Sequence, residues 1–163
     1  MVEEPLRIGR LRTAFLGGQL SATELIERVL TSIAKWDDPA LWIAPTSDTA
    51  LRQRAFELDA AAAADPDLIK RLPLFGIPFA VKDNIDVAGM PTTAACSAFA
   101  YTPSETAPVV RQLLSAGALL VGKTNLDQFA TGLVGTRSPY GVPRNPFDPR
   151  YIPGGSKGLR GTP

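Results

Sequence analysis

The stretch that decides the fold is Leu-Pro-Leu-Phe-Gly-Ile-Pro-Phe-Ala-Val-Lys-Asp-Asn, residues 72–84. A glycine and a proline bend the chain just before the apolar run 79–81. That run predicts a short buried strand, and the polar pair 83–84 predicts the turn that ends it. Lys82 therefore stands where a strand leaves the apolar interior.

Lys82 is a candidate base. Apolar surroundings disfavour the charged form of an amine, and a lysine that is partly neutral near pH 7 can accept a proton. The alternative interpretation is a lysine whose stem lies along apolar surface while its ammonium group stays in water. Position alone leaves both interpretations open.

The composition excludes several classes of protein. The 163 residues are 45% apolar and 20% charged, which is typical of one globular domain, and a formal charge of +1 offers no broad field for nucleic acid. No stretch is long and apolar enough to span a membrane, and the first residues do not resemble a signal peptide. One cysteine, Cys96, cannot form an internal disulfide, so we expect a cytoplasmic protein.

The absence of histidine narrows the possible chemistry most. It removes nucleophile arrangements that depend on histidine, together with the usual zinc sites. If the chain takes part in acyl transfer, its base must be a lysine or a carboxylate.

The N-terminal part is expected to be mainly helical. Residues 8–16 predict a short helix, and Ser21 with Glu24 forms a capping box before a second, amphipathic helix. Residues 41–44 predict a strand, and Thr46 or Ser47 starts a further long helix.

After the strand at Lys82, a small, hydroxyl-rich loop at 89–97 is expected to pack close to a site. Ser104 is expected to cap a helix over 105–115, followed by a strand at 118–121 and a short helix over 126–131. Residues 138–155 predict a long ordered loop or a linker, because proline and glycine interrupt all periodicity. Alternating helices and strands indicate the α/β class.

Residues 117–124 match the spacing of a phosphate-binding loop: glycine, four residues, glycine, lysine, threonine. Such a loop needs a strand before the first glycine and small polar residues between the two glycines. Here a helix is expected first, and the four intervening residues are themselves a strand. The match therefore favours a structural role over nucleotide binding.

Several motifs occur together in one order. They are Phe-Gly-Ile-Pro-Phe-Ala-Val-Lys-Asp-Asn at 75–84, Gly-Met-Pro-Thr-Thr at 89–93, Gly-Lys-Thr-Asn-Leu-Asp-Gln-Phe-Ala-Thr-Gly at 122–132, Arg-Asn-Pro-Phe-Asp at 144–148 and Pro-Gly-Gly-Ser at 153–156. Over about residues 20–156 the chain strongly resembles the amidase signature family. The run 127–141 is most similar to its allophanate hydrolase branch, whereas the A subunits of the related tRNA-dependent amidotransferases usually carry an acidic residue where Gln128 stands.

The resemblance implies a Ser–Ser–Lys mechanism without a metal or cofactor. Lys82 matches the family's base, and Ser156 matches the bridging serine, whose peptide bond from Gly155 would be cis. Substrate-binding positions would be Thr131, Gly132, Leu133 and Val134. Arg137 is a candidate contact for a carboxylate-bearing substrate, with an ordinary surface arginine as the alternative.

The resemblance also implies an incomplete domain: the N-terminal portion of an α/β fold in which helices cover a mixed sheet. We expect a helical region at 1–70, a motif-bearing core at 71–156 and a tail at 157–163 that departs from the family. The family's nucleophilic serine lies well beyond Ser156, and the sequence ends at Pro163. We therefore expect an amidase or allophanate hydrolase by descent that is inactive by itself.

The expected partners follow from this interpretation. A small amide, allophanate, is the implied substrate, with no nucleic acid and no membrane. Strands left without neighbours would expose an edge through which the chain could associate with itself or with another chain. The alternatives are a non-catalytic interaction module and a fragment of the A subunit of a tRNA-dependent amidotransferase.

Overall fold

The computed structural model describes residues 6–154, which form an α/β unit around a small mixed sheet. Its helices are α1 (Ile8–Leu16), α2 (Ala22–Trp36), α3 (Asp48–Ala64), α4 (Leu68–Arg71) and α5 (Pro108–Ser115), and its strands are β1 (Trp42–Pro45), β2 (Pro78–Lys82) and β3 (Leu119–Thr124). The strand order is β1-β3-β2; β2 runs parallel to β3, and β1 runs antiparallel to it.

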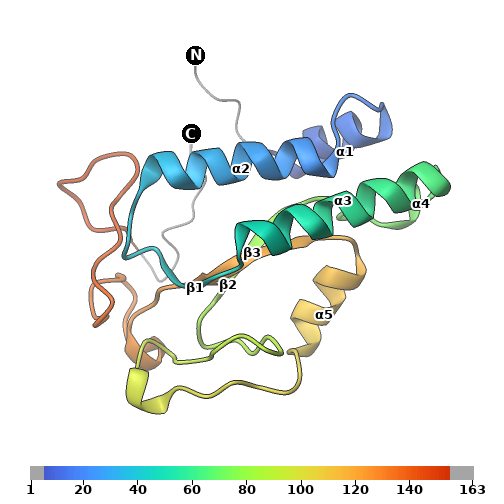
Figure 1. Cartoon of the computed structure of the whole chain (residues 1–163). Coiled ribbons are helices and arrows are strands. Elements are labelled where there is room, and N and C mark those ends of the chain that lie inside the picture. Colours follow the sequence, from blue (N-terminus) through green and yellow to red (C-terminus); the bar gives the residue numbers. More distant parts are fainter. Residues whose placement is uncertain (1–5, 155–163) are drawn as a thin grey trace.

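Two long helices form a layer over the sheet. In Figure 1, α2 and α3 run side by side above the strands, and α5 lies on the other side. The apolar stripe of α2 packs into the main core, where Leu25 and Ile26 are fully buried. The predicted capping box is present, and Asp59 of α3 accepts hydrogen bonds from the amides of Ala22 and Thr23. One carboxylate thus satisfies free N–H groups at the start of the neighbouring helix.

The predicted elements in the N-terminal half are confirmed. The first helix spans Ile8–Leu16, and Ser47 caps α3 by accepting a hydrogen bond from the Ala50 amide. The two predicted strands around residues 42 and 79 are also present, each within one residue of the expected bounds.

The prediction for the start of α5 is wrong. This helix begins at Pro108 rather than Glu105, and Ser104 does not cap it. Residues 106–107 are instead hydrogen-bonded to the loop after β2. The Ala88 amide donates to the Thr106 hydroxyl, and the Ala107 amide donates to the carbonyl of Asp86. Proline suits the first helical position, because its missing N–H would have no helical partner.

Two further bounds differ from the predictions. The third strand continues to Thr124, and residues 126–131 contain only a short 3-10 turn, Gln128–Ala130, instead of a helix. Gly122 lies inside this longer strand, where a Cβ atom would come within 2.8 Å of the Pro45 backbone. The glycine therefore allows β1 and β3 to approach closely, a role unrelated to phosphate binding.

The segment after residue 138 has neither helix nor strand as far as residue 154, but it is anchored to the rest of the fold. The side chain of Asn125 donates to the carbonyls of Ala40 and Gly141. The Arg144 amide donates to the buried carboxylate of Asp38 at 2.7 Å. The prediction of an ordered loop is therefore confirmed for its described part.

Candidate active site

Lys82 is the last residue of β2, and in the parallel register it lies beside Thr124, the last residue of β3. Because the two strands are parallel, the chain leaves both of them at the same edge of the sheet. The loops that follow, 83–96 and 125–137, meet at this end of the molecule, coloured yellow-green and orange in Figure 1. In α/β folds this edge is the usual place for a ligand site.

The Lys82 side chain is half-buried, and it forms no hydrogen bond or ion pair with any residue from 6 to 154. The lysine of the neighbouring strand β3 differs in both respects. Lys123 is fully buried, and its ammonium group donates to the carbonyl of Pro91 at 2.7 Å and to the hydroxyl of Thr92 at 2.6 Å. The described part of this edge therefore holds one amine with a structural task and one without.

Asp83, directly after Lys82, is the counter-charge of the buried lysine. Its carboxylate lies 3.4 Å from the Lys123 ammonium, and both side chains are fully buried. The other carboxylate oxygen accepts a hydrogen bond from the Thr93 amide at 2.9 Å. Burial lowers the pKa of Lys123 from its ordinary value, while the adjacent Asp83 carboxylate opposes that change.

Asp127 organises the second loop in a similar way. Its buried carboxylate accepts backbone hydrogen bonds from Val134 at 3.1 Å, Gly135 at 2.9 Å and Arg137 at 2.7 Å. Burial opposes ionisation of this carboxyl group, but the backbone N–H donors outweigh it and hold the pKa of Asp127 below its ordinary value. A Cβ atom at Gly132 would collide with the same carboxylate, so this loop needs a glycine there.

The two loops are joined to one another. The Phe129 amide donates to the carbonyl of Ala94 at 2.9 Å, and the Gln128 side chain donates to the carbonyl of Ala95 at 3.2 Å. Four of the non-glycine residues with left-handed backbone angles lie at this junction: Ala94, Ala95, Phe129 and Ala130. Such angles are unfavourable for residues with a side chain and concentrate at functional sites.

The predicted substrate-binding positions lie in the loop that Asp127 holds. Thr131 and Leu133 are exposed, whereas Gly132 and Val134 are partly buried, and the Arg137 side chain is exposed. No contact in the described structure assigns these residues to a substrate, so their role stays a prediction. Ser156 and its peptide bond from Gly155 lie outside the described residues.

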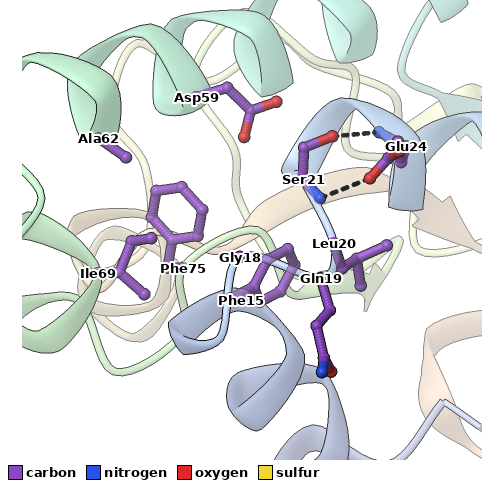
Figure 2. A pocket seen from close by; sticks show the side chains of 10 residues that line it. All are labelled: Phe15, Gly18, Gln19, Leu20, Ser21, Glu24, Asp59, Ala62, Ile69 and Phe75. Carbon is purple, nitrogen blue, oxygen red and sulfur yellow. Dashed lines mark hydrogen bonds between the residues drawn. The ribbon is translucent and has the colours of Figure 1, made fainter.

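A hollow of about 360 Å³ lies elsewhere, between the α1–α2 turn and α3. Figure 2 shows the side chains that line it, among them the rings of Phe15 and Phe75 and the capping pair Ser21 and Glu24. Phe75 precedes the amino end of β2, and Lys82 stands at the carboxyl end, so the hollow is not part of the edge described above. Its carboxylates already serve helix starts: Glu24 accepts from the Ser21 amide, and Asp59 from Ala22 and Thr23.

Sequence reasoning did not find Asp83, Lys123 or Asp127 as organising residues. A signal was present for Lys123, because a lysine inside the apolar run Leu-Leu-Val-Gly-Lys-Thr predicts a buried charge that needs a partner. The partner could not be identified, because Asp83 is 40 residues earlier in the chain. For Asp127 the sequence offers only a carboxylate followed by glycines.

The comparisons with known proteins agree with this geometry. A protein-family model described as Amidase matches residues 24–158. The chain belongs to the amidase signature family. No group of three or more potential metal-ligating side chains occurs among the residues described, and none of the described helices is long and apolar enough to cross a membrane.

Within the amidase signature family, several relatives are similar to this chain. It is 66% identical to urea amidolyase of Saccharomyces cerevisiae over 85 residues, 52% of this chain and 5% of that protein. It is 44% identical to the A subunit of glutamyl-tRNA(Gln) amidotransferase of Symbiobacterium thermophilum over 155 residues, 93% of this chain and 31% of that protein. The structure of Kluyveromyces lactis allophanate hydrolase matches with a TM-score of 0.70 and 42% identity, covering 89% of this chain and 24% of that one.

The chain thus spans about a third or less of the length of these relatives. It carries part of an amidase-signature domain, with a small mixed sheet and its covering helices. Both loops at the carboxyl edge of the sheet fall within the residues that match the family.

Proposed function

We propose that this chain is the lysine-bearing part of an amidase-signature domain that hydrolyses allophanate to ammonia and carbon dioxide. Lys82 would accept a proton through Ser156 from a nucleophilic serine of the same domain, whose oxygen would attack the amide carbonyl. The same proton would return to the amide nitrogen, so that the C–N bond breaks, ammonia leaves and the acyl group stays on the serine. Water would then release the acyl group. Thr131, Gly132, Leu133 and Val134 would border the substrate, and Arg137 would pair with its carboxylate.

The observation that carries this proposal is the position of Lys82. An amine without a partner among residues 6–154 stands at the edge where two loops, each held by a buried carboxylate, come together. The 66% identity to a urea amidolyase supports the allophanate branch.

The A subunit of a tRNA-dependent amidotransferase is the second candidate, supported by 44% identity over nearly the whole chain. The contact of Gln128 argues for the allophanate branch instead. Its side-chain amide donates to the Ala95 carbonyl at 3.2 Å, which an ionised acidic side chain at this position could not do. The contact between the two loops in this chain therefore uses a side-chain donor that glutamine has at position 128 and an ionised acidic residue lacks.

The test is a chimaera in which residues 24–154 replace the matching segment of the Kluyveromyces lactis allophanate hydrolase. Ammonia release from allophanate is expected, and Lys82→Ala is expected to reduce kcat by at least about a hundredfold, because general base catalysis of this kind contributes about 10² to 10⁴. Lys70→Ala is the matched control, because that lysine is exposed and, among residues 6–154, its ammonium group pairs with Asp67 alone. A folded chimaera whose activity does not depend on Lys82 would contradict the proposal.

The same design separates the two enzymatic candidates. The matching replacement is also made in the A subunit of a glutamyl-tRNA(Gln) amidotransferase. If the hydrolase chimaera fails on allophanate while the amidotransferase chimaera supports glutamine-dependent amide transfer with its partner subunits, the second candidate is correct.

A non-catalytic role as an interaction module would use the edge of β2 that faces away from β3. Among the described residues β2 pairs only with β3, so its other edge can accept a strand from a second copy or from another chain. Sedimentation at increasing concentration tests this: association is expected, and a monomer at all concentrations would exclude pairing through this edge.

A further inference from the structure

We infer that Lys123 is a positioning residue of the same site: its ammonium group joins the start of the loop 83–96, at Asp83, to residues 91–92 and so fixes the edge where Lys82 stands. The inference rests on the function proposed above for that edge. Lys123 itself does not touch the substrate position that the family resemblance assigns. It acts through Asp83 and the segment 91–96.

The ammonium group of Lys123 makes two hydrogen bonds and one ion pair. It lies 2.7 Å from the carbonyl of Pro91, 2.6 Å from the hydroxyl of Thr92 and 3.4 Å from the carboxylate of Asp83. The side chain is inaccessible to water. A buried cation with these partners has one favourable orientation, because each lost contact would leave a polar group unsatisfied.

The partners of Lys123 lie at two places in the loop 83–96, its first residue and residues 91–92. Asp83 is the residue directly after Lys82. Its amide donates to the carbonyl of Thr124, so this hydrogen bond holds β2 and β3 together at their carboxyl ends. Pro91 and Thr92 begin the segment 91–96. Thr92 extends the network, because its hydroxyl donates to Asp86 at 2.8 Å.

The segment 91–96 also contacts the second loop. Ala94 and Ala95 hold left-handed backbone angles, and their carbonyls accept hydrogen bonds from Phe129 and Gln128. A backbone in this conformation needs outside contacts to persist. Lys123 supplies contacts at the start of the segment, and the second loop supplies them at its end.

The single cysteine offers a direct probe of this arrangement. Cys96 is half-buried at the end of the segment, and its amide donates to the Thr93 carbonyl at 2.8 Å. Lys123→Met preserves the apolar stem and removes the charge. We expect this change to raise the rate at which an aromatic disulfide reagent labels Cys96 by at least about tenfold, because breaking a buried ion pair is strongly destabilising.

Two further variants complete the experiment. Lys70→Met removes an exposed lysine from its surface pair with Asp67, and it is expected to leave the labelling rate unchanged within about twofold. Thr92→Val removes one contact of the ammonium group and keeps the charge pair, so an intermediate rate is expected. If Lys123→Met does not fold, Thr92→Val still decides the question, and an unchanged Cys96 rate in a folded variant overturns the inference.

The catalytic readout uses the chimaera. Lys123→Met is expected to lower kcat about tenfold or more with a smaller change in KM, because a displaced base weakens the chemical step rather than substrate binding. Faster Cys96 labelling with an unchanged kcat, in a chimaera that still depends on Lys82, would overturn the positioning role and leave the proposed function intact. If Lys82→Ala also has no effect on kcat, the proposed function fails, and the positioning role fails with it.

Discussion

The layer of α2 and α3 and the carboxyl edge of β2 and β3 are held together by different forces. In the layer, apolar side chains such as Leu25 and Leu51 fill the space between helices and sheet. At the edge, buried charges on Asp83, Lys123 and Asp127 organise backbone in left-handed conformations. The layer thus follows general packing rules. The edge contains buried charges and left-handed backbone angles, and such unfavourable features are expected at functional sites.

The largest expected effect is at Asp127. Replacing it with alanine leaves the amides of Val134, Gly135 and Arg137 without this acceptor. The Gly135 amide is buried, and a buried donor without a partner costs about 1–3 kcal/mol; the other two are partly buried and add less. We expect Asp127→Ala to release the loop, with hydrogen exchange of the Phe129 amide at least about a hundredfold faster. Amides of α2 should be little affected, and equal acceleration in both regions would show that the edge is not an independent unit.

Leu25→Ala is the corresponding change in the helical layer. Leu25 is 1% exposed, and removing a buried leucine side chain costs about 2–5 kcal/mol through lost burial and the cavity left behind. We expect this loss to appear in the free energy of unfolding of the whole chain, measured with urea, and to be the same at about pH 7 and pH 4, because no charge is removed. Phe56→Ala is the control, because that side chain is 61% exposed and should contribute little.

The two regions also differ in how far the sequence predicted them. The helical layer could be predicted from Ser21, Glu24 and the apolar stripe of α2, because caps and periodicity are local signals. The position of Lys82 at a strand end was predicted for the same reason. The helix expected at 126–131 is absent, because the Asp127 carboxylate binds amides seven to ten residues ahead and takes the chain out of helical geometry.

Ser104 and Lys123 show the same limit. Ser104 satisfies the local rule for a cap, but contacts between residues 86–88 and 106–107 determine that segment. Lys123 follows directly after the predicted strand 118–121 and its glycine, yet its partner Asp83 comes from a different strand end. Local patterns do not contain the pairing of distant charges, and the candidate site depends on such pairs.

A pH experiment sharpens the comparison through Asp127→Asn. The pKa of Asp127 is held below its ordinary value in the folded chain. The ionised carboxylate therefore stabilises the folded state fully when the pH is above the pKa of the unfolded chain, about 4. That contribution is lost as the pH falls through the lower, folded-state pKa. The wild-type chain should therefore exceed Asp127→Asn in unfolding free energy at about pH 7, and the difference should shrink below about pH 4; a difference that grows in acid would contradict the assignment.

The smallest expected effect comes from replacing alanine with glycine, which should change the free energy of unfolding in opposite directions in the two regions. Ala130 is exposed at the edge and has a left-handed backbone with φ +58°. This conformation costs a residue with a Cβ atom about 1–2 kcal/mol, and glycine avoids that cost. Glycine also loses more backbone entropy on folding than alanine does, which offsets part of the gain. Ala130→Gly should therefore stabilise the chain by about 0.5–1 kcal/mol. Ala60 is exposed inside α3, and Ala60→Gly should destabilise it by about 1 kcal/mol, since glycine is a poor helix former. Urea midpoints that move in opposite directions would show that the edge holds strain and the layer does not, whereas two destabilising changes would mean that the left-handed backbone at Ala130 carries no measurable strain.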